Sequence, residues 1–182
     1  MASSLQRWRR AAATLAGALA LATAACDGAQ AQAAPPTDDR LAGVVTVPAD
    51  WRAQPTVARA AAAAAGADAE VAAWGEPGLG CFAIVVATRA PHQHPEDALE
   101  ELRVALTEAL GLDGWSADAT AGRGRIARAP MTGELRGTVA VAAPKGAQVT
   151  LAACFYNQRD PDACRAQCAG VLDSLDASKV KP

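Results

Sequence analysis

The chain has 182 residues, 49 of them alanine, and only 4% of its residues are aromatic. The hydrophobic fraction of 51% therefore consists mainly of small side chains. Charged residues make up 20% and the formal net charge is −2, which excludes a strongly basic nucleic-acid binder and an acidic disordered chain. The length fits a single domain.

Residues 1–25 have the pattern of a signal peptide. Arg7, Arg9 and Arg10 form a positively charged start, and residues 11–25 are uncharged. A membrane-spanning helix needs about 20 apolar residues, so this shorter run indicates a signal peptide rather than a permanent anchor. No later apolar run is longer. The pattern predicts an exported protein.

The sequence Thr-Ala-Ala-Cys at 23–26 resembles the lipobox of bacterial lipoproteins, with Thr23 where that family usually has leucine. The resemblance implies that Cys26 becomes the mature N-terminus and carries a diacylglyceryl group on its sulfur. Two or more acyl chains give stable membrane anchoring. The alternative is ordinary secretion, with cleavage after Ala31 or Ala33.

Domain organisation follows from composition. Residues 26–41 are small, polar and proline-containing, which predicts a flexible tether before an α+β domain at 42–177 and a tail at 178–182. Without the three signal-peptide arginines, 14 basic residues face 19 acidic ones, a net charge of −5. This charge favours solubility and disfavours polyanionic partners such as nucleic acid.

The first half of the domain predicts a strand, a helix and a hairpin. The β-branched segment Gly43–Val47 indicates a strand, and Trp51 is a candidate core residue. The alanine-rich segment Thr56–Ala65 favours a helix with Gly66 near its C-cap, although a strand is the alternative. The strands Glu70–Trp74 and Cys81–Thr88 flank a glycine-rich turn.

The second half predicts a helix, three strands and a final helix. Leu99, Leu102, Leu106 and Leu110 form one stripe of a helix over Pro95–Leu110, ended by Gly111. The expected strands are Arg125–Pro130, Leu135–Ala143 and Gln148–Tyr156, with a turn at 144–147. A helix starting at 160–162 presents Cys164, Cys168, Val171, Leu172 and Leu175 on one face.

This order of elements indicates one α+β domain with an antiparallel-rich sheet covered by helices. Val47, Pro48 and Trp51, the stretch at 69–75 and the stretch at 151–155 with a later cysteine resemble PsbP-like domains. That family is named for an extrinsic subunit of the photosynthetic oxygen-evolving complex and includes exported bacterial lipoproteins of unknown activity. The resemblance covers about residues 42–176. It implies an α/β/α sandwich without a shared catalytic residue.

Besides Cys26, four cysteines remain: Cys81, Cys154, Cys164 and Cys168. In an exported protein, such an even set predicts structural disulfides. A bridge within one helical turn is geometrically poor. Two connectivities therefore stay open, namely Cys81–Cys164 with Cys154–Cys168, or Cys81–Cys168 with Cys154–Cys164. We favour the second because residues 155–163 are long enough to reverse the chain direction.

Other reactive side chains give weaker patterns. His92 and His94 offer imidazole ligands, but the sequence has no third histidine, so we interpret them as loop residues. The arginines in 122–125 with Arg128 and Arg136 form the one basic cluster, which could pair with an anion but fits solvated arginines better. No mature serine lies in Gly-x-Ser-x-Gly. We therefore expect no enzyme and no cofactor.

These patterns together predict an exported protein of the cell envelope, anchored to the membrane by lipid on Cys26. Its small non-enzymatic domain would bind another envelope protein or a cell-wall component. The alternative is a small metal or ligand carrier that uses His92 and His94 or a reduced pair of Cys164 and Cys168.

Overall fold

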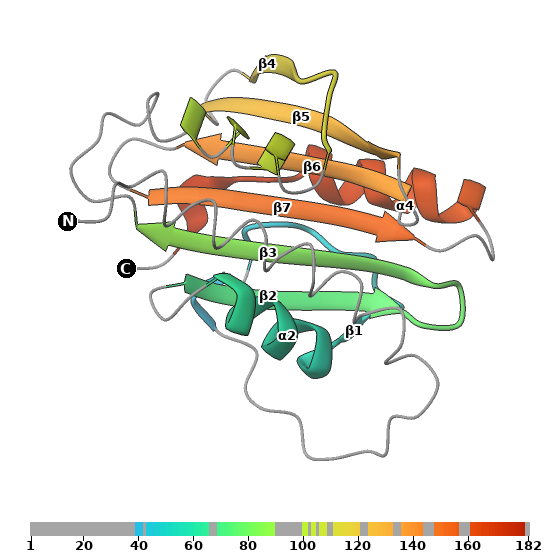
Figure 1. The fold of residues 1–182 in the computed structure, drawn as a ribbon. Coiled ribbons are helices and arrows are strands. Elements are labelled where there is room, and N and C mark those ends of the chain that lie inside the picture. Colours follow the sequence, from blue (N-terminus) through green and yellow to red (C-terminus); the bar gives the residue numbers. More distant parts are fainter. Residues whose placement is uncertain are drawn as a thin grey trace.

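The computed structural model describes residues 39–41, 43–65, 69–89, 111–120, 124–132, 136–143, 148–156 and 161–180, together with 100, 101, 103, 104 and 106–108 (Figure 1). The expected signal peptide, Cys26, His92, His94, Gly66 and the turn at 144–147 lie outside these residues.

Seven strands form one sheet in the order β1-β2-β3-β7-β6-β5-β4 (Figure 1). All neighbouring strands are antiparallel. The strands are β1 (Arg52–Ala53), β2 (Ala69–Glu76), β3 (Cys81–Arg89), β4 (Ser116–Thr120), β5 (Gly124–Thr132), β6 (Arg136–Ala143) and β7 (Gln148–Tyr156). The expected α+β class with an antiparallel sheet is confirmed.

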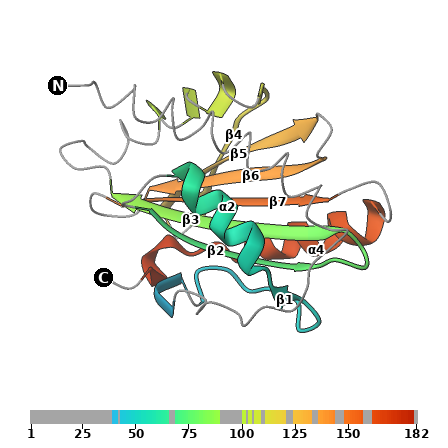
Figure 2. The same ribbon diagram turned by 60° about the horizontal axis from the view of Figure 1, so that its bottom comes forward.

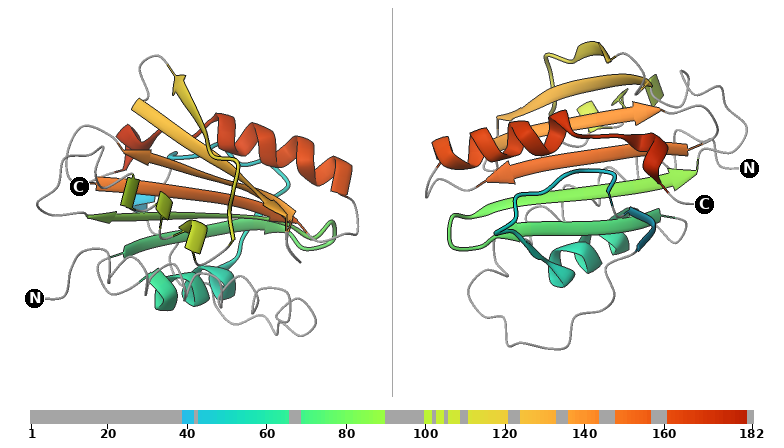
Figure 3. Two further views of the ribbon diagram at one scale, coloured as in Figure 1. Left: turned by 45° about the horizontal axis from the view of Figure 1, so that its top comes forward. Right: turned by 180° about the vertical axis from the view of Figure 1, so that it is seen from behind.

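Helices cover both faces of this sheet, as Figure 2 and the two views of Figure 3 show. Helix α2 (Pro55–Ala65) packs on one face, which settles the choice between helix and strand for this segment. Helix α4 (Pro161–Asp173) packs on the opposite face. The chain therefore forms three layers.

Strand alternation divides the core into two apolar clusters. Successive side chains of a strand point to opposite faces, so Ala153 and Phe155 of β7 join the cluster under α2, while Ala152 and Cys154 join the one under α4. On the α2 side the rings of Phe82 and Phe155 stack with centroids 5.8 Å apart. Because both faces are covered, the segment at 81–87 is buried at every position.

The helix expected over Pro95–Leu110 is described only in part. Residues 100, 101, 103, 104 and 106–108 are helical, and Leu106 is fully buried in the cluster under α2. The N–H of Gly111 donates to the carbonyl of Thr107, and Gly111 has φ +63°. A positive φ at this position ends a helix, as the sequence predicts for Gly111.

The strand expected over Gly43–Val47 is absent, and this prediction is wrong. The segment forms a turn in which Gly43 has φ +83° and the N–H of Val44 donates to the carbonyl of Leu41. Two further backbone groups of this segment bond to the chain's C-terminal part. Asp176 donates its N–H to the carbonyl of Val44, and the Ser174 hydroxyl accepts from the N–H of Thr46. Val44 and Val45 are buried as a strand would predict, but against α4's face of the sheet.

The folded region extends past both boundaries expected from composition. A 3-10 helix, η2 (Asp39–Leu41), precedes residue 42, and Leu41 is fully buried. Another 3-10 helix, η3 (Ala177–Lys179), is capped by Asp176, and Val180 is buried. The polar composition around Leu41 and Val180 therefore did not indicate that these two apolar side chains are buried at the edge of the core. No helix in the described ranges is long and apolar enough to cross a membrane.

Candidate functional site at the disulfide end of the sheet

Two disulfides join helix α4 to the sheet. Cys81 at the start of β3 bonds to Cys164, with Cα atoms 5.5 Å apart. Cys154 of β7 bonds to Cys168, with Cα atoms 5.3 Å apart. All four predicted cysteines are therefore brought together, but in the other of the two open connectivities, and the favoured pairing is wrong.

The direction of α4 explains this pairing. Cys81 lies opposite Tyr156, so it stands two residues beyond Cys154 along β7. Two strand residues span about 7 Å, and the four-residue step from Cys164 to Cys168 rises about 6 Å. The chain reverses direction after β7, so α4 runs back along that strand. Its first cysteine, Cys164, therefore meets Cys81, which lies opposite Tyr156 at the end of β7. Its second cysteine, Cys168, meets Cys154, two residues earlier on β7. We define the disulfide end of the sheet by Glu76, Cys81, Arg136 and Tyr156, which form one row across β2, β3, β7 and β6.

Helix α4 is held differently at its two ends. Near its start lie both disulfides, and the indole Nε1 of Trp51 donates to Oε1 of Gln167 at 3.1 Å. At its end, the guanidinium of Arg128 donates to Oδ1 of Asp173 at 2.7 Å and to the carbonyl of Leu172 at 3.3 Å. A cation there also matches the negative end of the helix dipole.

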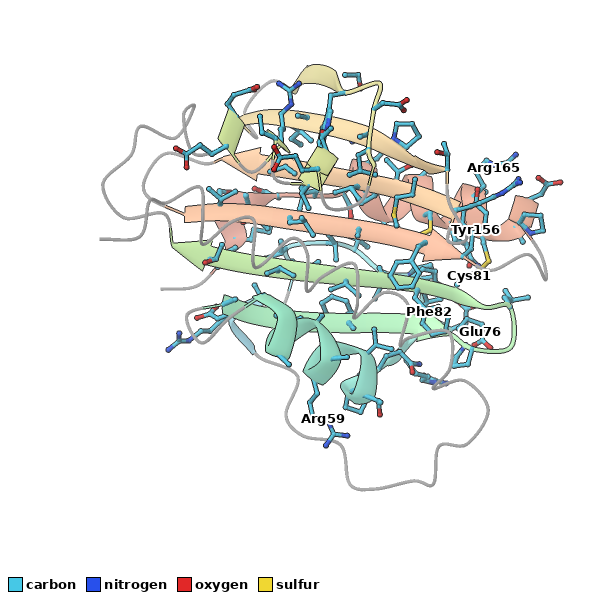
Figure 4. All side chains as sticks on the ribbon, in the orientation of Figure 1. Arg59, Glu76, Cys81, Phe82, Tyr156 and Arg165 are labelled. Atoms are coloured by element: carbon cyan, nitrogen blue, oxygen red, sulfur yellow. A yellow bond between two sulfur atoms is a disulfide. The ribbon has the colours of Figure 1, made fainter. Side chains whose placement is uncertain are left out.

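Polar side chains gather on the α4 side of the disulfide end. Arg136 faces Tyr156 directly in the β6–β7 register, and Tyr156 faces Cys81 in the β7–β3 register. Figure 4 shows Arg165 projecting from α4 beside Tyr156 and Cys81. Tyr156 is 7% exposed, whereas Arg136 and Arg165 are exposed. The nearly buried Tyr156 thus has Arg136 opposite it in the sheet and Arg165 beside it on α4.

Arg165 is held in its charged form. Its pKa is raised above the ordinary value, first by its hydrogen bond with Tyr156 and then by electrostatic interaction with Tyr156 and Asp162. The carboxylate of Asp162 lies 3.1 Å from the Arg165 guanidinium.

The basic cluster expected from the sequence is divided. Arg128 lies opposite Ala140, and Arg136 lies opposite Thr132, so four residues of strand separate the two rows. This separation is about 13 Å. Arg128 belongs to the end of α4, and Arg136 belongs to the disulfide end. The side chains in 122–125 lie outside the described residues.

The alternative function, a metal carrier, was expected to use either His92 and His94 or a reduced pair of Cys164 and Cys168 as ligands. The structure removes the second set. Both Cys164 and Cys168 are in disulfides, so neither supplies a thiolate in this oxidised structure. Within the described ranges, no three His, Cys, Asp or Glu side chains lie close enough to hold a metal ion. His92, His94 and the expected lipid site Cys26 lie outside those ranges and stay predictions.

Sequence reasoning did not select Tyr156 or Arg165. The available signal was indirect, because Tyr156 shares the alternation of Cys154 along β7 and Arg165 directly follows Cys164. Their meeting depends on the helix direction and on the disulfide pairing.

The architecture and this end of the sheet define an α+β protein with a disulfide-bonded helix. No known family model, no curated protein and no solved structure matches the chain.

Proposed function

We propose that this protein is an exported, lipid-anchored protein of the cell envelope whose small domain binds a partner and catalyses no reaction. The observation that carries the proposal is the pair of disulfides between α4 and the sheet. Disulfides persist in oxidising compartments outside the cytosol. The signal-peptide pattern and the Thr-Ala-Ala-Cys sequence at 23–26 support the same location.

The placement of the described N-terminus supports a binding domain held near a membrane. The 3-10 helix η2 lies beside the start of β2, where Arg40 pairs with Glu70. Glu76, at the other end of β2, belongs to the disulfide end. Twelve residues lie between Cys26 and Asp39, and the thirteen steps from one to the other span at most about 45 Å in a fully extended chain. Asp39, the first described residue, thus lies near the end of β2 that is remote from the two disulfides.

The resemblance to PsbP-like domains belongs to this proposal. One antiparallel sheet with helices on both faces is compatible with the α/β/α sandwich that the resemblance implies. That family has no shared catalytic residue, which supports a binding role.

Membrane attachment is tested with the full chain expressed in a bacterium that processes lipoproteins. We expect the wild-type chain to fractionate with membranes and to incorporate labelled palmitate, whereas Cys26→Ala does neither. The matched control is Met131→Leu, which also removes one sulfur from the chain but conserves core volume and leaves Cys26 and both disulfides in place. Undiminished membrane association of Cys26→Ala would contradict lipid anchoring.

A further inference from the structure

Arg136 and Arg165 approach Tyr156 from two different elements. Directly opposed residues of an antiparallel pair have Cα atoms about 4.5–5.5 Å apart, which places Arg136 next to Tyr156. The bond between Cys81 and Cys164 fixes the start of α4 over the same row, and Arg165 follows Cys164 in the chain. The backbone positions of Arg136 and Arg165 are thus fixed by a sheet register and by a covalent bond at the neighbouring Cys164.

Among the residues that the structure describes, the charges at this place leave about one positive charge in excess. Asp162 pairs with Arg165, but among the described residues no acidic side chain pairs with Arg136. Glu76 stands two strands away, on the far side of Cys81. A monoanion therefore fits this place better than a dianion, which Asp162 would repel.

The hydrogen-bond donors of Arg136 and Tyr156 also suit a monoanion. A guanidinium presents a planar fork of donors that pairs with both oxygens of a carboxylate. The Tyr156 hydroxyl, when its oxygen accepts from Arg165, still has one proton to donate. A carboxylate that reaches Arg136 can thus receive donors from a guanidinium and from a phenol.

We propose that Arg136, Tyr156 and Arg165 form a binding site for one carboxylate group of a peptide partner. This inference rests on the proposed binding role and names the chemistry of the partner: an acidic side chain or a chain terminus. The site lies at the disulfide end, remote from η2, where the described part of the chain begins.

The test is an NMR titration of the purified, oxidised full chain in detergent, observed at the arginine Nε–H and tyrosine signals. The probe is acetate, compared with inorganic phosphate and chloride at the same ionic strength. We expect acetate to shift the Arg136, Arg165 and Tyr156 signals saturably, with a dissociation constant of the order of millimolar, and to bind more tightly than phosphate. Arg136→Gln and Arg165→Gln should each weaken acetate binding about tenfold or more.

The control variant is Arg59→Gln, since Arg59 is exposed on α2 at the opposite face (Figure 4) and its removal should leave acetate binding unchanged. Arg136→Lys keeps the charge but lacks the fork, so it should bind between wild type and Arg136→Gln. Acetate shifts no larger than those with chloride, equal losses in Arg59→Gln, or tighter binding of phosphate would each overturn the proposal. None of these outcomes bears on membrane attachment through Cys26, which the fractionation experiment tests separately.

Discussion

At Gly137, strand β6 approaches β7 so closely that no side chain fits. A Cβ at this position would lie 2.1 Å from the carbonyl oxygen of Cys154 and 2.7 Å from the Cα of Phe155. Both atoms belong to backbone that the sheet ladder and the bond to Cys168 hold in place. The close approach therefore requires glycine.

We predict that Gly137→Ala lowers the free energy of unfolding by about 2–4 kcal/mol, because the β6–β7 ladder must open to admit the methyl group. Urea unfolding measures the change. The control is Gly170→Ala on the exposed side of α4, where an added Cβ meets nothing within 4 Å. That variant should gain about 0.5–1 kcal/mol from helix propensity. Equal effects of the two variants would contradict the packing argument.

Helix α4 depends on covalent bonds more than on apolar contact. Its buried residues are Cys164, Cys168, Val171 and Leu172, so only the last two are large apolar side chains. The start of the helix therefore owes its position to the two disulfides and to the bond between Trp51 and Gln167.

We predict unequal losses when the bridges are removed in pairs. The Cys81–Cys164 bond closes a separation of 83 residues and the Cys154–Cys168 bond one of 14. The chain-entropy relation gives about 4.5 kcal/mol for the first and about 3 kcal/mol for the second. Urea unfolding of the Cys81→Ala/Cys164→Ala and Cys154→Ala/Cys168→Ala double variants measures the difference. A larger loss for the second pair would show that native-state packing, and not loop closure, governs the effect.

The end of α4 gives a smaller, electrostatic prediction. Arg128→Ala removes the pair with Asp173 and the hydrogen bond to the carbonyl of Leu172. Because Asp173 is largely exposed, we expect a loss of only about 1 kcal/mol in thermal or urea unfolding. Arg52→Ala, on the short edge strand β1, is the control and should change stability by less than about 0.5 kcal/mol. A loss in the control as large as in Arg128→Ala would contradict a specific role of the helix end.

Elements with a strong local period could be predicted from the sequence. The strands around 81–88, 135–143 and 148–156, and the helix at 56–65, follow from β-branched runs and from alanine. Strand β4 was missed because its sequence, Ser-Ala-Asp-Ala-Thr, has little strand propensity and its pairing with β5 decides its conformation. The segment Gly43–Val47 shows the opposite case. Its local pattern favours a strand, but it forms none because the chain's C-terminal part binds its backbone.

The candidate site was predictable only in its cysteines. Spacing identified the four cysteines and left two connectivities, but the choice between them depends on the direction in which α4 crosses β7. The placement of Arg136 and Arg165 around Tyr156 requires the β6–β7 register and that pairing together. Neither the strand register nor the disulfide pairing can be predicted from a short stretch of the sequence.

At the scale of the whole molecule, the first and the last described stretches of the chain contribute to one apolar cluster. Leu41 and Val180 pack on the same face of the sheet, beside the segment that joins η2 to β1. Figure 3 shows this segment alongside α4. The limits of the domain are therefore set by packing and not by the change in composition near residue 41.

We predict that a chain ending at Ala177 is less stable than one ending at Val180 by about 1–3 kcal/mol, because the shorter chain loses the burial of the Val180 side chain and opens the cluster around Leu175. Thermal unfolding of the two truncated chains measures the difference. Identical midpoints would show that residues 178–180 add nothing to the fold.

The disulfides are interleaved along the chain: the first of the four cysteines bonds to the third, and the second bonds to the fourth. During export from the N-terminus, Cys81 and Cys154 would emerge before either of their true partners. An oxidant acting on cysteines in order of arrival would then join Cys81 to Cys154 and trap α4 away from the sheet. For the exported protein that we propose, the observed pairing would then form only by thiol–disulfide exchange, in which a free cysteine thiolate displaces one sulfur of the first bridge.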